Sequence, residues 1–167
     1  MKLIDRKVKE NLWRYLSQCF LATLTIFAIL LFLDILNEAA IIAALGASAF
    51  IVFTMPTKYS SEPRRLIGGY IVGVLIGCSF YFLSISNEFA SLFGDRQLSL
   101  AIFASLAVGI AMFIMAVTNS EHAPAAGIAL GLVLNEWDYV TIIFILGAIL
   151  WMAGVRKLLK PLLMDLI

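Results

Sequence analysis

The stretch Gln97–Val117, QLSLAIFASLAVGIAMFIMAV, contains no charged side chain. A helix rises about 1.5 Å per residue, so a helix of this length would span a hydrocarbon layer of about 30 Å. Two other stretches have similar length and polarity, namely Leu66–Ile85 and Ser17–Leu36, the latter with Asp34 near its end. The three stretches together predict helices that cross a membrane.

The composition of the whole chain agrees with this prediction. Of its 167 residues, 62% are apolar and 14% are charged, whereas soluble domains contain roughly 45–50% apolar and about 25% charged residues. We therefore expect an all-α, polytopic transmembrane helical bundle. The formal net charge of +1 gives no indication of a nucleic-acid partner. The lipid bilayer is the expected surrounding.

Three further apolar stretches complete the predicted set of membrane elements. Tyr139–Val155 is long enough to cross, and Ala39–Met55 is at the lower limit of length. The third, Ala123–Leu134, reads APAAGIALGLVL and would cover only about 18 Å as a helix. The sequence thus predicts six elements, of which one or two are short or broken.

The distribution of basic residues indicates that the short stretch also crosses. The segment before Ser17 has five Lys or Arg, whereas the loop Thr57–Arg65 and the C-terminal segment have three each, and the links 37–38 and 135–138 have none. Cytoplasmic loops of membrane proteins are enriched in Lys and Arg. Six passages place every basic-rich segment, and both termini, in the cytoplasm. We expect a plasma membrane location, of the bacterial inner-membrane type.

The expected domain organisation is simple. Met1–Leu16 reads as an interfacial amphipathic helix, with a solvated tail as the alternative, and residues 17–160 form one transmembrane domain. Residues 17–85 and 97–155 would be two three-helix units of inverted orientation. In each unit the middle passage is the short one, preceded by an acid, Glu38 or Glu121.

Small residues recur at helical spacing in three of the predicted passages, where they allow two backbones to approach closely. These seams are Gly69, Gly73 and Gly77; Ala40, Ala44 and Ser48; and Ala101, Ser105 and Gly109. We expect them to form the core. A bundle of this length is thin, so a homo-oligomer, with a dimer favoured, is expected to assemble through the glycine faces.

The break before the short fifth passage is the candidate site. Pro124 suits the first turn of a helix, so Asn119, Ser120 and His122 would lie at or before its N-terminus, where free N–H groups attract an anion. The alternative for His122 is a hydrogen bond to a backbone carbonyl of a neighbouring segment. Glu121 is a candidate proton carrier for anion–proton symport, or it reaches interface water.

Three blocks of the sequence resemble the HPP integral membrane proteins, a family named after a His-Pro-Pro motif. They are ALGASA at Ala44–Ala49, EPRRLIGGY at Glu62–Tyr70 and HAPAAGIAL at His122–Leu130. Ala123 stands where the family has proline. Some members act in nitrite transport, and for most the activity is undetermined. The resemblance implies a small-anion transporter, with nitrite as the candidate substrate.

The remaining candidate residues complete the predicted mechanism. Ser48 and Gly46 would bring a second short-helix N-terminus toward the first near mid-membrane, although Ser48 could instead bond to the carbonyl four residues earlier. Arg64 is preferred to its neighbour Arg65 as an anion ligand, against the alternative that both serve only topology and anionic lipid.

Other classes of function receive less support from the sequence. It shows no hydrolase or metalloprotease motif and has one histidine, so we expect neither an enzyme nor a metal or other cofactor. Cys19 and Cys78 lie inside apolar stretches and are read as packing residues. The alternative to transport is a membrane scaffold or accessory subunit that assembles through its small-residue helix faces.

Overall fold

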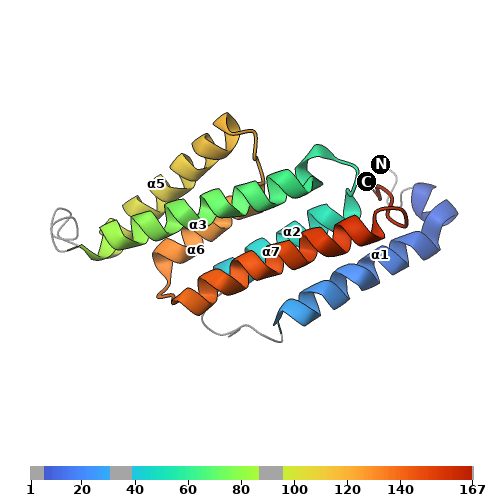
Figure 1. Ribbon diagram of the computed structural model, residues 1–167, viewed down its shortest axis with the longest axis horizontal. Helices are drawn as coiled ribbons and strands as arrows, with labels where there is room; N and C mark the ends of the chain where they lie inside the picture. The colour runs from blue at the N-terminus through green and yellow to red at the C-terminus, as the bar shows by residue number, and fades with distance from the viewer. Residues whose placement is uncertain (1–5, 31–38, 87–95, 167) are drawn as a thin grey trace.

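The computed structural model describes residues 6–30, 39–86 and 96–166 (Figure 1). Each regular element in these ranges is helical, which confirms the predicted all-α fold. The elements are α1 (Arg6–Leu30), α2 (Ala39–Thr54), the 3-10 turn η1 (Tyr59–Ser61), α3 (Pro63–Ile85), α5 (Arg96–Val117), α6 (Ala123–Leu134) and α7 (Tyr139–Leu159).

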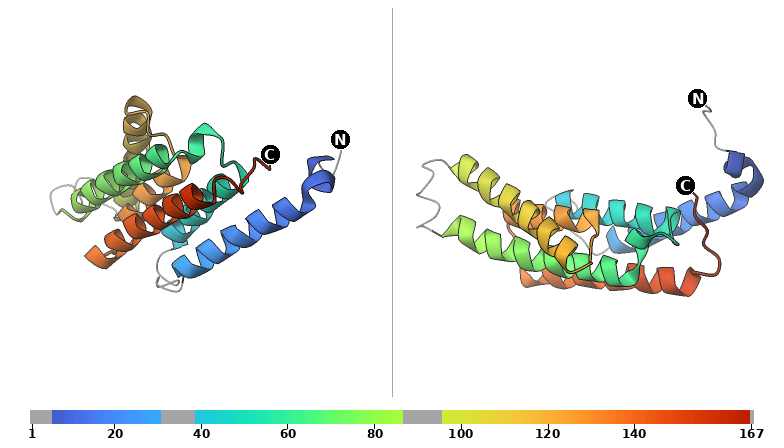
Figure 2. Two further views of the ribbon diagram at one scale, coloured as in Figure 1. Left: turned by 45° about the vertical axis from the view of Figure 1, so that its right-hand side comes forward. Right: turned by 90° about the horizontal axis from the view of Figure 1, so that it is seen from above.

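Helices α2, α3, α6 and α7 form the centre of the bundle, while α1 packs on α2 at one side and α5 packs on α3 and α6 at the other (Figures 1 and 2). Within the described residues, three helices, α3, α5 and α7, are long and apolar enough to cross a membrane, and α2 and α6 are shorter apolar helices. The start of α1 and the segment after α7 lie near the same end of the bundle (Figure 1). We call this end, which also holds the loop 55–62, the termini end, and the segment 118–122 lies nearer the middle of the long axis.

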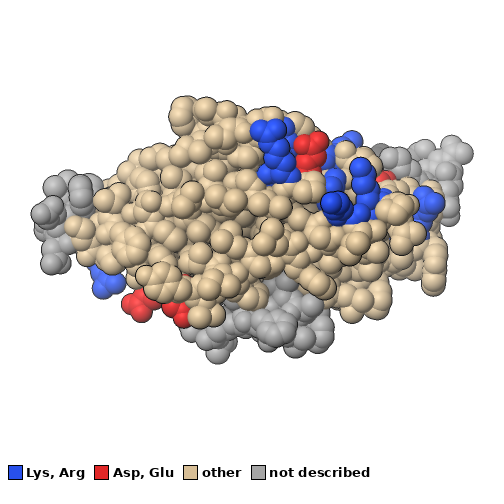
Figure 3. All heavy atoms as spheres, viewed as in Figure 1, with Lys and Arg blue, Asp and Glu red and all other residues tan. Residues whose placement is uncertain are grey.

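Charged side chains form two groups along the long axis (Figure 3). On the face shown, the larger group reaches from the middle of the axis to the termini end, and a smaller charged group lies toward the opposite end. The surface between them is uncharged. This is the distribution that a bundle needs if the uncharged surface is to lie in hydrocarbon and the charged groups in water.

Helix α1 runs past Leu16, the predicted end of the interfacial helix, and the interfacial position of residues 1–16 stays a prediction. The helix continues from Arg6 to Leu30, and its one non-helical residue is Asn11, with φ −132° and ψ 27°. The change of direction therefore lies at Asn11. Met1–Asp5 and the predicted end of the first span, 31–36, lie outside the described residues.

Helices α3 and α6 pack so closely that the glycines of α3 are required. A Cβ built on Gly73 would overlap the carbonyl oxygen of Ala125, and one on Gly77 would lie 2.9 Å from the Cβ of Leu132 and 3.0 Å from the Cα of Ala129. Distances below 3.0 Å are not sustained by real Cβ atoms. The seam Gly69, Gly73, Gly77 therefore faces α6, inside the chain.

The predicted seam on α5 is wrong. Ala101, Ser105 and Gly109 are exposed, and a Cβ on Gly109 would meet nothing within 4 Å. The buried face of α5 is formed instead by larger and small apolar residues together, namely Phe103, Ala104, Ala107, Ala111 and Met115. Small-residue spacing alone does not tell which face of a helix has a partner, because this depends on where the other helices lie.

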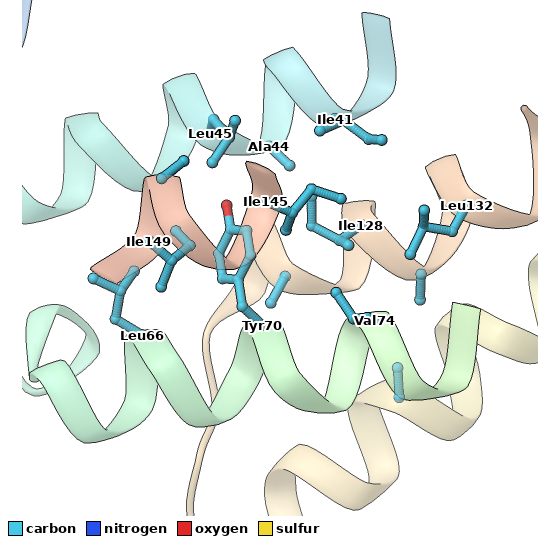
Figure 4. Packing of buried hydrophobic residues seen from close by; sticks show 14 of the residues in the cluster. Ile41, Ala44, Leu45, Leu66, Tyr70, Val74, Ile128, Leu132, Ile145 and Ile149 are labelled. Atoms are coloured by element: carbon cyan, nitrogen blue, oxygen red, sulfur yellow. The ribbon is translucent and has the colours of Figure 1, made fainter. Parts of the chain in front are cut away.

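The cluster of buried hydrophobic residues contains one aromatic hydroxyl, that of Tyr70. Tyr70 of α3 is fully buried and points into the space between α2, α6 and α7 (Figure 4). Leu45 of α2, Ile128 of α6 and Ile149 of α7 surround it in the same view. The hydroxyl oxygen points toward α2, where it requires a hydrogen-bond partner because a buried polar group without one is costly.

The N-terminus of α7 has a carboxylate cap at the opposite end of the bundle. The Asp138 carboxylate accepts hydrogen bonds from the backbone N–H of Thr141 (2.8 Å) and from its hydroxyl (3.0 Å). These hydrogen bonds from Thr141 hold the pKa of Asp138 below its ordinary value. A folded-state pKa below the unfolded one contributes stability above the unfolded pKa, and this stability is lost as the pH falls through the folded pKa.

We therefore expect this cap to weaken in acid. In Asp138→Asn the amide oxygen still caps the helix, so the thermal midpoint should change little at pH 7 and should lose the part of its acid dependence due to this carboxylate, below about pH 4. Asp138→Ala should lower the midpoint at pH 7. Thermal unfolding of the full chain in detergent at several pH values measures both. Equal midpoints for Asp138→Ala and wild type would refute the assignment.

Candidate functional site

The connector Thr118–His122, between α5 and α6, begins with a helix cap. Asn119 has a left-handed backbone (φ 56°), the N–H of Ser120 donates to Met115 O (2.9 Å), and the N–H of Asn119 donates to Ala116 O (3.3 Å). This is a Schellman cap, with asparagine in the position that glycine usually takes. The cap ends α5 and turns the chain toward α3.

The connector then crosses α3 at a glycine pair. A Cβ on Gly68 would lie 3.0 Å from the Cβ of Ser120, and one on Gly69 would lie 2.8 Å from the Cβ of His122 and 3.0 Å from Ser120 O. The second HPP-like block, with its two glycines, thus leaves room for the chain that carries the third block. Ser120 is buried, and its hydroxyl lies 2.8 Å from that of Thr118.

His122 is the N-cap of α6 and is 1% exposed. Its Nδ1 lies 3.1 Å from Ser60 O, and its Nε2 lies 2.8 Å from Ser48 Oγ. The Ser48 hydroxyl lies 2.8 Å from the hydroxyl of Tyr70. We call this set of residues (Ser60, His122, Ser48, Tyr70) the buried relay, and it links α2, α3 and α6 to the loop before α3.

The Ser60 carbonyl, at one end of the buried relay, sets the direction of the hydrogen bonds in it. The carbonyl of Ser60 can only accept, so Nδ1 donates to it, and in the neutral ring Nε2 then accepts. The Ser48 hydroxyl therefore donates to His122 and accepts from Tyr70. Ser48 lies six residues before Thr54, where α2 ends, so the relay is about 9 Å inside that helix end. Ser48 does not bond back to Ala44 in this arrangement.

A second polar group lies nearer the termini end. Arg65, from the first turns of α3, forms an ion pair with Glu121 of the connector, and its Nη2 donates to the Asn119 side chain at 2.7 Å. Its Nε lies 3.4 Å from a Glu62 carboxylate oxygen. The guanidinium lies over the ring of Tyr59, whose hydroxyl donates to Asn119. These five residues form what we call the Arg65 cluster.

The cation and the anions of the Arg65 cluster differ strongly in exposure. The Arg65 side chain is 3% exposed, whereas Glu121 is 46% and Glu62 is 53% exposed. A second buried arginine, Arg156 of α7, donates to Pro56 O at 2.6 Å and to Ser61 Oγ at 3.4 Å. The Nε atoms of Arg65 and Arg156 are buried without a hydrogen-bond partner. Positive charge thus lies inside, and negative charge faces outward.

The structure brings most of the predicted site residues together. Asn119, Ser120, Glu121 and His122 form the connector, and Ser48 reaches it from α2. Gly46 is partly buried, and a Cβ there would meet nothing within 4 Å, so it has no visible part in the site. His122 has the arrangement given as its alternative, a hydrogen bond to a backbone carbonyl, together with the contact to Ser48.

The preference for Arg64 over Arg65 is not supported by the geometry. Arg64 is exposed, and Arg65 is the residue that contacts the connector. A signal for this was present in the sequence. Arg65 stands four residues before Gly69, so helical periodicity puts it on the same face as the glycine seam, and Arg64 is turned away by about 100°.

The predicted convergence of two short-helix N-termini is wrong. A Cβ on Gly131 of α6 would lie 3.2 Å from the Ala40 Cβ, a Cβ on Gly127 would lie 3.4 Å from the Ala44 Cβ, and His122 contacts Ser48. Helices α2 and α6 therefore run antiparallel, and their N-termini lie at opposite ends. Ser48 meets the start of α6 from within α2. Antiparallel middle helices agree with an inverted repeat, which itself remains a prediction.

Comparison with known proteins now places the chain in a family. The family model described as "HPP, transmembrane region" matches residues 7–159. The chain belongs to the HPP family. A curated transmembrane protein of Dictyostelium discoideum is 28% identical over 108 residues, which are 63% of this chain and 35% of that protein. The chain thus spans about a third of the length of that relative. No solved structure matches the chain.

Proposed function

We propose that this HPP-family membrane protein transports a small inorganic anion, with nitrite as the candidate, and that Arg65 is its anion ligand. The single observation that carries the proposal is a buried guanidinium whose ion-pair partner is nearly half exposed. A charged group inside a membrane protein is expensive and is usually placed for function. Here the partner that neutralises it can leave for water, and another anion can take its place.

The geometry of arginine suits this task. A guanidinium binds planar anions with two parallel N–H groups, and nitrite has two oxygens in one plane, like the carboxylate that now contacts Arg65. The Asn119 side chain and the ring of Tyr59 hold the guanidinium in position. The helix N-terminus of α6 lies beyond the connector, with His122 as its cap. In this proposal the buried relay organises the start of α6, and the anion binds at Arg65.

Anion flux into proteoliposomes tests the proposal. We expect Arg65→Gln to reduce flux at least tenfold, which corresponds to a loss of about 1.4 kcal/mol or more of anion stabilisation. The neighbouring Arg64→Gln is the matched control, because it removes the same charge from an exposed position, and it should retain wild-type flux. Nitrate should be measured beside nitrite, because nitrous acid crosses lipid without a protein. Equal flux for Arg65→Gln and wild type, with both folded, would refute the role of Arg65.

The second candidate is a scaffold or accessory subunit. The buried relay favours it. Tyr70 is hydrogen-bonded to Ser48, Ser48 to His122, and His122 to the carbonyl of Ser60, and this chain of hydrogen bonds gives α2, α3 and α6 a fixed arrangement. No flux above that of empty liposomes, for either anion, would favour this candidate.

Location and assembly are part of the proposal. We infer a bacterial plasma membrane with the termini end in the cytoplasm, as the basic residues indicate. A homo-oligomer, with a dimer favoured, stays a prediction, and it requires a contact other than the α3 glycine seam, because α6 covers that face.

A further inference from the structure

We infer that Asp165, in the segment that follows α7, is a positioning residue for the anion site. By holding the loop 55–62, it keeps Arg65 in the geometry that binds the anion. We call residues 161–166 the strap. This inference rests on the proposed function and deepens it, because it makes the affinity of the Arg65 site depend on a segment that does not touch the anion.

The strap crosses from α7 toward α1 at the end of α2 (Figure 2). The side-chain amide of Gln18, which is 1% exposed, donates to Phe53 O at 2.7 Å and to Met164 O at 2.9 Å. It also accepts from the N–H of Met164 at 3.4 Å. The N–H of Leu166 donates to Thr54 O at 2.8 Å. Phe53 and Thr54 belong to the last turn of α2, whose carbonyls have no partner within the helix, so the strap and Gln18 together complete this helix end.

Asp165 lies between two buried anchors of the strap. Leu163 and Leu166 are both buried, and Leu163 belongs to the main hydrophobic cluster. The Asp165 carboxylate accepts a hydrogen bond from the backbone N–H of Thr57 at 3.0 Å and another from the Thr57 hydroxyl. Because the strap is anchored on both sides of Asp165, the carboxylate is a fixed point that holds the loop at Thr57.

The loop 55–62 is held from two sides. Arg156 of α7 donates to Pro56 O at 2.6 Å, and the strap holds the next residue, Thr57. The hydroxyl of Ser61 lies 3.0 Å from Pro56 O and ties the end of the loop to its beginning. A displacement at Thr57 is therefore passed on to the residues that follow it.

Two of those residues contact the site directly. The ring of Tyr59 lies against the guanidinium of Arg65, and Ser60 O lies 3.1 Å from Nδ1 of His122. They follow Thr57 by two and three positions. A binding group acts well only when its neighbours hold it in place. Without the hold at Thr57, the anion would have to order Arg65 as it binds, and this cost would lower the affinity.

Nitrate binding to the full chain, purified in detergent, tests the inference. Asp165→Ala removes both hydrogen bonds to Thr57 and should weaken nitrate binding at least about fivefold. Asp165→Asn should bind nitrate as wild type does, because an amide can accept from the N–H and donate to the hydroxyl. If Asp165→Ala does not fold, Thr57→Val, which lacks only the hydroxyl, should also weaken binding, and Thr57→Ser should restore it.

The matched control is Asp138→Ala, at the opposite end of the bundle. The Asp138 carboxylate also accepts from the backbone N–H and the hydroxyl of a threonine, Thr141, so its loss removes the same kind of contact far from the site. This variant should have a lower thermal midpoint and the nitrate affinity of wild type. Equal nitrate affinity for Asp165→Ala and wild type would overturn the inference and leave anion transport standing.

Amide hydrogen exchange without nitrate separates the inference from the proposed function. Asp165→Ala should speed exchange in residues 55–62 and 118–122, whereas Asp138→Ala should change neither segment. If wild type neither binds nor transports nitrate, the proposed function is overturned. Faster exchange in both segments of Asp165→Ala would then still support the hold of the strap on the Arg65 cluster, and unchanged exchange would overturn it as well.

Discussion

Replacing Gly73 by valine is expected to separate α3 from α6 and to cost about 3 kcal/mol or more of unfolding free energy. Even the first carbon of the new side chain would overlap the carbonyl oxygen of Ala125, which is backbone and belongs to a helix. Neither helix can relax locally, because α3 also lies close to α6 at Gly77 and close to the connector at Gly68 and Gly69. Unfolding of the purified chain in detergent, by heat or by added denaturing surfactant, measures the loss.

Gly109→Val is the control for this prediction. It makes the same change in a neighbouring apolar helix, α5, where a Cβ meets nothing within 4 Å. We expect an effect within about 0.5 kcal/mol, as for most substitutions at unobstructed surface positions. If both valine variants had equal stability, the close approach of α3 and α6 would be wrong.

The second large effect is expected at His122. His122→Ala removes the acceptor of Ser48 and the donor to Ser60 and leaves a cavity between α2 and α3, so it should cost about 2–4 kcal/mol. Ser48→Ala should cost about 1–3 kcal/mol, because it leaves the Tyr70 hydroxyl and the Nε2 of His122 without the partner that Ser48 provides. The same unfolding measurement in detergent applies.

The double variant distinguishes a connected relay from two independent sites. Because both single changes remove the same Ser48–His122 hydrogen bond, the double variant should cost about 1–2 kcal/mol less than the sum. Ser79→Ala is the matched control on α3, since the Ser79 hydroxyl is exposed and bonds only to Leu75 O. Additive costs for Ser48→Ala and His122→Ala would show that the two residues do not share a hydrogen bond in the protein.

Much of the site lay within reach of the sequence. The proline at the start of α6 and the short apolar stretch that follows it are local features, and they place the interruption between two passages at the connector. The same periodicity that identified Gly69 and Gly73 as a seam also puts Arg65 on that face. The family-like block Glu62–Tyr70 contains both Arg64 and Arg65, so helix rotation is what separates the two.

Other parts of the site were not accessible in this way. Ser48 and His122 are 74 residues apart, and Arg65 and Glu121 are 56 apart. Which side chain of α2 meets the start of α6 depends on the lateral position and rotation of two separate helices. The sequence predicts that the two short passages run in opposite directions, but it does not tell whether such helices meet end to end or, as here, pack side by side with their N-termini at opposite ends.

The sequence by itself determined that the chain is a helical membrane protein, where most of its passages lie and which face of α3 accepts a close neighbour. These properties depend on the length of charge-free segments and on residue size within one helix, so each is local. Only the tertiary structure decided that α2 and α6 pack side by side along their length, that Arg65 and not Arg64 contacts Glu121, and that the α5 small-residue stripe faces outward. Such contacts join segments far apart in the chain, and they are set by how all the helices pack together.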